Sequence, residues 1–133
     1  MPEPPAAFAG VGPDALSYVH VDDLAAVRGF VGTRAQALGL APDRIARLLI
    51  AVSELATNTL RHTTGGGRVW VFAEPGFVVC DVADGGPARE FGREMPAADA
   101  LSGRGLAIVE RMCDDVSTAT GPEGTLVRLR LRL

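Results

Sequence analysis

The sequence contains no lysine, because all 13 of its basic residues are arginine. A Walker P-loop needs a lysine that reaches the phosphates, so this nucleotide-binding motif is excluded. The strand lysine of protein kinases and Schiff-base chemistry on lysine are excluded for the same reason. Asparagine is nearly absent as well, since Asn58 is the only one. Any nucleotide chemistry must therefore use backbone amides, carboxylates, hydroxyls, arginines and this one asparagine.

Cysteine and histidine are also scarce, and the net charge is small. Cys80 and Cys113 are far apart and form no CxxC motif, which predicts free thiols in a reducing compartment. His20 and His62 are too few for a zinc site. A net charge of −3 does not favour nucleic acid or anionic membranes. Neither a membrane span nor a signal peptide is recognisable, so we expect a cytoplasmic protein that binds neither nucleic acid nor membrane.

The length and the hydrophobic content predict one folded domain. The chain has 133 residues, of which 47% are hydrophobic. Residues 1–16 are rich in proline and small side chains, which is typical of a disordered tail. We therefore expect a single domain over residues 17–133.

Hydrophobic periodicity predicts an α+β two-layer sandwich. Apolar residues spaced by three or four predict helices over 24–38, 42–62 and 103–113. Runs with β-strand character and turn residues predict strands over 17–21, 69–73, 77–82, 116–120 and 125–133, with a long loop over 84–102. The last strand alternates apolar residues with arginines, so one sheet face is expected to be buried and the other solvated. The helices then cover the buried face. The arginine row is interpreted as a solvated face, with a partner surface as the alternative.

The second predicted helix carries the first candidate site. Glu54 and Asn58 are four residues apart and therefore share a side of this helix. A carboxamide oxygen can coordinate Mg²⁺, and a carboxylate can accept a proton from a nucleophile. The alternative is that both residues belong to the ordinary polar face of a surface helix, opposite the apolar one.

Three further motifs follow along the chain. Asp84 and Gly86 end a strand, where a carboxylate can accept a hydrogen bond from an exocyclic amine and a glycine lets a ring approach the backbone. The run 103–106 (GRGL) opens a predicted helix whose amide groups can bind an anion. Thr125 follows Gly124 at the start of the last strand. Each motif alone is also compatible with a plain turn or helix start.

The order of these motifs resembles the N, G1, G2 and G3 boxes of the GHKL superfamily, which includes gyrase and histidine kinases. The resemblance covers residues 17–133 and implies the Bergerat fold, a mixed, mostly antiparallel sheet with three helices on one face. The run 52–62 (VSELATNTLRH) is most similar to the small anti-sigma-factor serine/threonine kinases. Ala88 departs from the pattern, because a second glycine is frequent at that position.

The resemblance implies a role for each matched residue. Glu54 resembles the general base and Asn58 the Mg²⁺ ligand. Asp84 resembles the adenine-binding carboxylate. The ATP-binding residues implied in all are Asn58, His62, Asp84, Gly86, Ala88, Gly103, Arg104, Gly105, Leu106 and Thr125.

The function implied is that of an ATP-binding and Mg²⁺-dependent anti-sigma regulator. Such a protein transfers phosphate from ATP to a serine or threonine of an anti-anti-sigma (STAS) antagonist and binds a sigma factor. A homodimer is also implied. The alternatives are a nucleotide-binding interaction module without catalysis and a stand-alone GHKL ATPase. The positive charge beside the γ-phosphate is expected from Arg89, Arg93 or Arg104.

Overall fold

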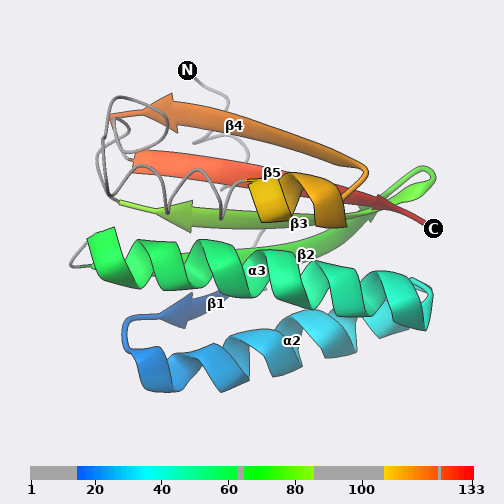
Figure 1. Cartoon of the computed structure of the whole chain (residues 1–133), viewed down its shortest axis with the longest axis horizontal. Helices are drawn as coiled ribbons and strands as arrows, with labels where there is room; N and C mark the ends of the chain where they lie inside the picture. The colour runs from blue at the N-terminus through cyan, green and yellow to red at the C-terminus, as the bar shows by residue number, and fades with distance from the viewer. Residues whose placement is uncertain (1–14, 63–64, 86–106, 123) are drawn as a thin grey trace.

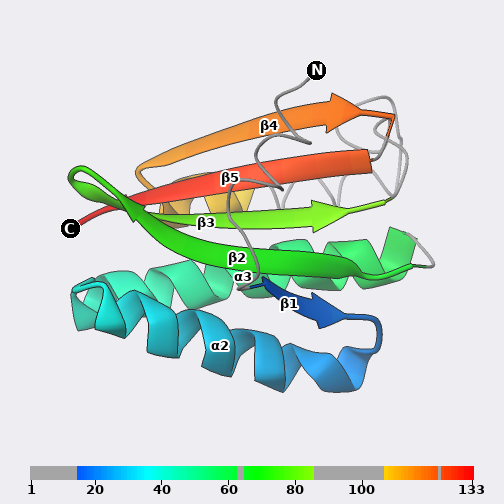
Figure 2. The same cartoon turned by 180° about the vertical axis from the view of Figure 1, so that it is seen from behind.

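The computed structural model describes residues 15–62, 65–85, 107–122 and 124–133. Five strands form one sheet in the order β1-β2-β3-β5-β4, and all four neighbouring pairs are antiparallel. The helices of the described residues lie on one face of this sheet (Figures 1 and 2). The expected α+β sandwich is confirmed. The named elements are β1 (Ala15–Tyr18), η1 (Val21–Asp23), α2 (Leu24–Ala37), α3 (Pro42–His62), β2 (Gly67–Glu74), β3 (Phe77–Asp84), β4 (Asp115–Gly121) and β5 (Gly124–Arg132).

The two long helices begin and end where their terminal residues predict. α2 ends in a Schellman arrangement, in which Gly39 has a φ of 97°. The N–H of Leu40 donates to the Ala35 carbonyl, and the N–H of Gly39 donates to that of Gln36, both at 3.0 Å. α3 starts at Pro42, a residue suited to the first helical position because its missing N–H needs no partner there.

Each strand differs from the predicted one at one or both ends, the first strand most. The first strand covers Ala15–Tyr18, two residues earlier than expected, because residues 15–18 pair with β2 and the chain then enters η1. Residues 15–16 therefore belong to the sheet and not to a tail. Of the third predicted helix, 103–113, the structure describes residues 107–113, of which 107–112 are helical. The tail residues 1–14 and most of the long loop lie outside the described residues.

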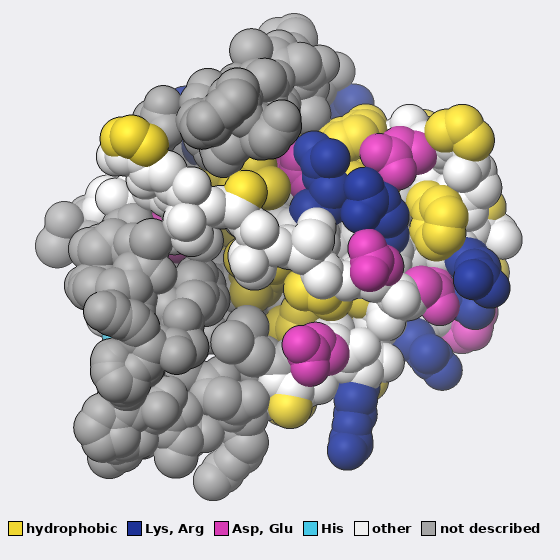
Figure 3. Space-filling view, turned by 90° about the horizontal axis from the view of Figure 1, so that it is seen from above, with side chains coloured by type: hydrophobic (Ala, Val, Ile, Leu, Met, Phe, Trp, Pro, Cys, Tyr) yellow, Lys and Arg dark blue, Asp and Glu magenta, His cyan; other side chains and the backbone are white. Residues whose placement is uncertain are grey.

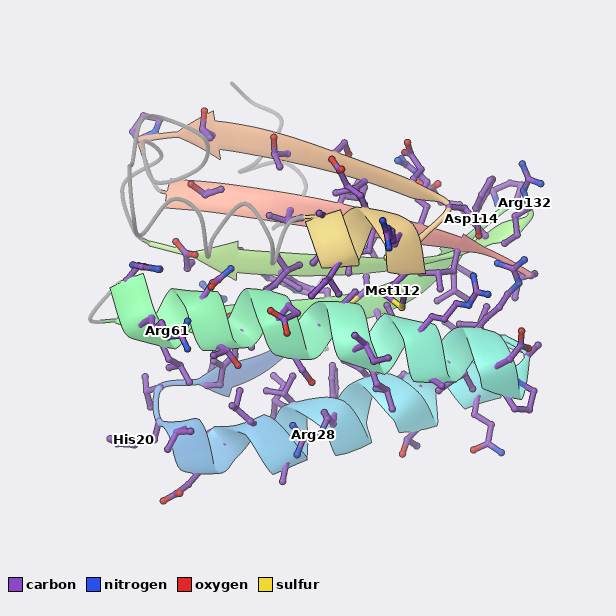
Figure 4. The ribbon with its side chains drawn as sticks, in the orientation of Figure 1. His20, Arg28, Arg61, Met112, Asp114 and Arg132 are labelled. Carbon is purple, nitrogen blue, oxygen red and sulfur yellow. The ribbon has the colours of Figure 1, made fainter. Side chains whose placement is uncertain are left out.

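The core lies between the sheet and the helices. Side chains of one phase on each strand point into it, as in β5, where Val127, Leu129 and Leu131 are buried. Leu48, Val52 and other apolar residues of α3 pack against them. Val109 joins this core from the 107–112 helix, and Met112 lies between that helix and α3 (Figure 4). Leu133, expected on the buried side of the last strand, is exposed because it follows the last residue of β5.

The opposite sheet face holds ion pairs between its arginines and carboxylates. Arg128 forms two hydrogen bonds, of 2.8 and 2.7 Å, with the fully buried carboxylate of Asp81. Arg130 contacts Glu74 and Asp115. Arginine side chains gather among carboxylates on the surface seen in Figure 3. Arg128 and Arg130 are therefore less solvated than expected, because their charges are paired with carboxylates of the sheet, whereas Arg132 is exposed as expected.

None of the helices in the described part of the chain is long and apolar enough to cross a membrane.

Candidate functional site

A row of four residues crosses the sheet at the end where β3 stops and β5 begins. Tyr18 is paired with Gly67, Gly67 with Asp84, and Asp84 with Thr125. Residues paired in this way share a face of the sheet. The C-terminal part of α3 lies over the same end (Figure 1, left). The sheet register therefore places two predicted site residues, Asp84 and Thr125, side by side.

Thr59 of α3 joins the helix to this row. Its hydroxyl Oγ1 lies 3.2 Å from Asp84 Oδ2 and 3.1 Å from the Leu55 carbonyl oxygen, so both are acceptors for its single proton. The Tyr18 hydroxyl donates to the same Oγ1 at 3.0 Å. Both Thr59 and Tyr18 are buried. The Asp84 carboxylate is thus connected to α3 through one side chain.

Gly67 makes room for this connection. A Cβ on Gly67 would lie 2.5 Å from the Tyr18 hydroxyl oxygen and 2.5 Å from the Ala83 carbonyl oxygen, closer than real Cβ contacts come. The Tyr18 phenol therefore passes directly over the Gly67 backbone on its way to α3. Burial is the main cause that raises the pKa of Tyr18 well above its ordinary value of 10, so this hydroxyl stays a donor.

Thr125 is the second polar side chain buried at this end of the sheet. It is 2% exposed, and its Oγ1 has no hydrogen-bond partner among the described residues. The preceding Gly124 has a φ of 134°, and a Cβ there would overlap the Asp84 carbonyl oxygen. The two strands are therefore packed backbone to backbone beside Asp84. A buried hydroxyl without a partner is costly in the free protein and suits a site that a ligand completes.

Glu54 and Asn58 lie at the border of the buried stripe of α3. Both are half-buried, whereas the exposed Ile50 occupies the side away from the sheet. At 100° per residue Asn58 lies about a quarter of a turn, and Glu54 about a third of a turn, from the middle of the buried stripe. Neither residue therefore lies directly opposite the buried stripe, and Asn58 is the nearer of the two to it. Asn58 precedes Thr59, so the turn of α3 that meets Asp84 also carries Asn58.

His62 is exposed at the last residue of α3. Its neighbour Arg61 lies at the same end of the helix, where the chain leaves toward β2 (Figure 4). This end is also the one above the Tyr18–Thr125 row.

Several predicted site residues lie outside the described part of the chain. They are Gly86, Ala88, Gly103, Arg104, Gly105 and Leu106, together with Arg89 and Arg93. Their roles remain predictions.

A pocket of about 450 Å³ opens at the end of β1, β2 and β3. It is bordered by Tyr18, by the glycines 65–67 and by Asp84 with Gly85. Glu54, Asn58 and Thr125 do not line it, so it extends from Asp84 toward β1 and away from those three residues.

Metal binding at this site cannot depend on a preformed cluster in the described part of the chain. The residues in that part form no group of three or more histidine, cysteine or acidic side chains that could hold a metal ion. Mg²⁺ commonly takes one or two protein oxygens and completes its shell with water and substrate phosphates. The Asn58 carboxamide fits that kind of ligation.

Sequence reasoning missed Tyr18, Thr59 and Gly67. The available signal was the position of Thr59, a polar residue at a buried phase of α3 after Val52, Leu55 and Ala56. A polar residue in such a stripe indicates a hydrogen-bond partner on the facing layer. The identity of that partner depends on the sheet register, which the spacing of apolar residues does not give.

Residues 19–131 match the family described as the histidine kinase-like ATPase domain. The chain therefore belongs to this family, and the resemblance to GHKL proteins is confirmed at that level. No curated protein matches the chain.

Among solved structures, the chain is similar to "The crystal structure of the RsbU and RsbW domains of Rv1364c from Mycobacterium tuberculosis". The TM-score is 0.66 at 22% sequence identity, and the match covers 91% of this chain and 33% of that one. The chain thus spans about a third of the length of that protein chain. At this identity the likeness concerns the fold.

Proposed function

We propose that the row at the end of β3 and β5 binds the base of ATP. Asp84 accepts a hydrogen bond from the 6-amino group of adenine, as expected from the family resemblance. Thr125 offers the base, or a water bound with it, the hydroxyl that has no partner among the described residues. The observation that carries this proposal is the half-buried Asp84, which contacts the buried Thr59 and is paired with the buried Thr125.

Asn58 and His62 are proposed to face the phosphates. Both lie on the last two turns of α3, above the same end of the sheet. The Asn58 carboxamide oxygen is a hard ligand that adds no charge, and it would hold the Mg²⁺ bound with ATP. When bound, the ion offsets negative charge that develops on the phosphates. Backbone amides and one guanidinium are expected from the run Gly103, Arg104, Gly105 and Leu106. The base is expected to be bordered by Gly86 and Ala88.

Glu54 is proposed as the general base. It lies one helical turn before Asn58 on the same side of α3 and is half-buried. A carboxylate in this place can accept the proton of an attacking serine or threonine hydroxyl, while Asn58 would hold the Mg²⁺. The reaction proposed is phosphoryl transfer from ATP to a serine or threonine of a STAS-type antagonist. A sigma factor is the second proposed partner, and a homodimer the proposed assembly.

Label transfer tests this function directly. The full chain is incubated with γ-labelled ATP, Mg²⁺ and a STAS-type protein, and label on the antagonist is measured. Transfer by the wild type that is lost in Glu54→Gln supports the proposal. The matched control is Glu110→Gln, which changes an exposed glutamate of the 107–112 helix and is expected to retain transfer.

The alternatives give different results in the same assay. Steady phosphate release without an acceptor protein indicates a stand-alone ATPase. Nucleotide binding with neither transfer nor release indicates an interaction module. Transfer that survives Glu54→Gln removes Glu54 from the role of general base.

A further inference from the structure

The buried side chains behind Asp84 suggest how the base is selected. We propose that Thr59 is a positioning residue that fixes the Asp84 carboxylate for recognition of a 6-amino purine, and that Tyr18 in turn fixes Thr59. This inference rests on the proposed adenine site and assigns a role to two residues on different elements, β1 and α3. Neither residue needs to touch the nucleotide.

The direction of the hydrogen bonds follows from the chemistry of the groups. An ionised carboxylate only accepts hydrogen bonds, so the Thr59 hydroxyl is the donor in its 3.2 Å contact with Asp84 Oδ2. The Thr59 oxygen can then accept the proton of the Tyr18 hydroxyl at 3.0 Å. The result is a one-way chain of donors from Tyr18 through Thr59 to Asp84.

The Thr59 hydroxyl has two possible acceptors, the Asp84 carboxylate and a backbone carbonyl, and only one proton to donate. The Leu55 carbonyl oxygen lies 3.1 Å from Oγ1, which is the usual back-bond of a threonine within a helix. A hydrogen bond to a charged carboxylate is stronger than one to a neutral carbonyl, so the proton favours Asp84. The Tyr18 hydroxyl occupies an oxygen lone pair of Thr59 and limits how its hydroxyl can rotate.

Gly67 is required for this geometry. The Tyr18 phenol lies against the Gly67 backbone, and a methyl group in that place would meet both the hydroxyl oxygen and Cζ of Tyr18, at 2.5 and 2.7 Å. The chain Tyr18–Thr59–Asp84 thus depends on a glycine in the middle of the row. An alanine at position 67 is expected to displace the phenol from Thr59.

Fixing the carboxylate has a consequence for nucleotide choice. A site built around a held hydrogen-bond acceptor rejects a ligand that lacks the matching donor, because a buried polar group then loses its partner. A carboxylate free to rotate finds other partners and discriminates less. Thr59 should therefore affect the preference for a 6-amino purine more than it affects contacts to the phosphates.

The test compares ATP with purine riboside triphosphate, which carries hydrogen in place of the 6-amino group. The dissociation constants of both are measured by calorimetry with Mg²⁺ for the wild type, Thr59→Val and Thr59→Ser. We expect the wild type to prefer ATP by about tenfold or more. Thr59→Val should bring the ratio close to one, and Thr59→Ser, which keeps the hydroxyl, should restore it. A Thr59→Val ratio equal to that of the wild type overturns the inference.

Two further variants keep the test decisive. Thr59→Val leaves the buried Tyr18 hydroxyl without this acceptor, so the double variant Tyr18→Phe/Thr59→Val is measured if the single variant fails to fold. It should show the same loss of preference, and a retained preference overturns the inference. Gly67→Ala should lower the ratio in the same direction.

The proposed function and this inference fail in distinguishable ways. If the wild type binds neither nucleotide, the proposed adenine site is wrong, and the positioning role falls with it. A second case is that the wild type prefers ATP and that Asp84→Asn removes this preference whereas Thr59→Val keeps it. The proposed adenine site then stands, and the role given to Thr59 is wrong.

Discussion

Replacing Thr125 by valine should stabilise the free protein and weaken nucleotide binding. Valine has nearly the shape of threonine and suits a strand, so the change removes the hydroxyl with little effect on packing. That hydroxyl is buried and has no partner among the described residues. A buried hydroxyl without a hydrogen bond costs about 1–3 kcal/mol. We therefore expect Thr125→Val to raise the free energy of unfolding by about 1 kcal/mol.

Thr59→Val is the matched control and should have the opposite sign. It is the same isosteric change one layer away, but the Thr59 hydroxyl contacts Tyr18, Leu55 and Asp84. Its removal leaves the buried Tyr18 hydroxyl without this acceptor. A loss of about 2–3 kcal/mol is expected, since an unsatisfied buried partner carries the full desolvation cost.

Both changes can be followed through the single tryptophan. Trp70 is 2% exposed on the sheet face away from the helices, so its fluorescence reports unfolding without contact with the mutated side chains. Urea unfolding is measured with and without ATP and Mg²⁺. Ligand stabilises a folded protein by RT ln(1 + [L]/Kd), so the gain from ATP should be smaller in Thr125→Val than in the wild type. A destabilised Thr125→Val protein, or one with an undiminished gain from ATP, refutes the assignment of an unpaired ligand-binding hydroxyl.

Three further outcomes follow from other parts of the fold. Arg128→Met should lower the free energy of unfolding by about 3 kcal/mol, because the Asp81 carboxylate then stays buried without its cation. An unchanged midpoint of urea unfolding would contradict this. Iodoacetamide should label both thiols slowly at pH 8 until urea is added. The reason is that burial raises the pKa of Cys113 to about 12 and that of Cys80 well above its ordinary value. Rapid labelling of the folded chain would contradict this expectation. Hydrogen bonds from the Val19 and His20 amides lower the pKa of Asp23 in the folded protein below its ordinary value of 3.8. The stability that this carboxylate contributes is therefore complete above pH 3.8, the pKa of the unfolded chain. It is lost as the pH falls through the lower pKa of the folded protein. The stability difference between wild type and Asp23→Ala should shrink over that range, and a difference that grows instead would be inconsistent with it.

Much of the fold could be predicted because its boundaries are set by local chemistry. Pro42 and Gly39 mark the two ends of the turn between α2 and α3, and Gly76 has the positive φ that its hairpin turn requires. The alternation of arginine and apolar residues in β5 gave the inner face of the sheet correctly from Val127 to Leu131. These features need only neighbours in the sequence.

The contacts that define the candidate site depend on register and not on local pattern. Tyr18 and Thr59 are 41 residues apart, and their hydrogen bond exists because β1, β2 and β3 are aligned so that Gly67 lies between Tyr18 and Asp84. Motif order predicts Asp84 and Thr125 as site residues, but it does not show that they are paired, which depends on the β3–β5 register.

The same limit explains the arginine face. Asp81 stands in an otherwise apolar strand, at the phase opposite to the core, and it pairs with Arg128 on the adjacent strand. A lone carboxylate in an apolar strand and a row of arginines in another indicate an ion pair. A solvated face was expected instead, because no local signal shows that the two strands are neighbours.

Calorimetric titration of Asp84→Asn with ATP and Mg²⁺ is the sharpest test of the proposed adenine site. The substitution keeps the size of the side chain and an oxygen that can accept from Thr59. It replaces the other carboxylate oxygen, which is proposed to accept a hydrogen bond from the 6-amino group, by an NH₂ donor. We expect the wild type to bind one ATP per chain and Asp84→Asn to bind it about tenfold or more weakly, with the fold retained. A wild-type chain that shows no binding at millimolar ATP, or an Asp84→Asn chain that binds as tightly as the wild type, would contradict it.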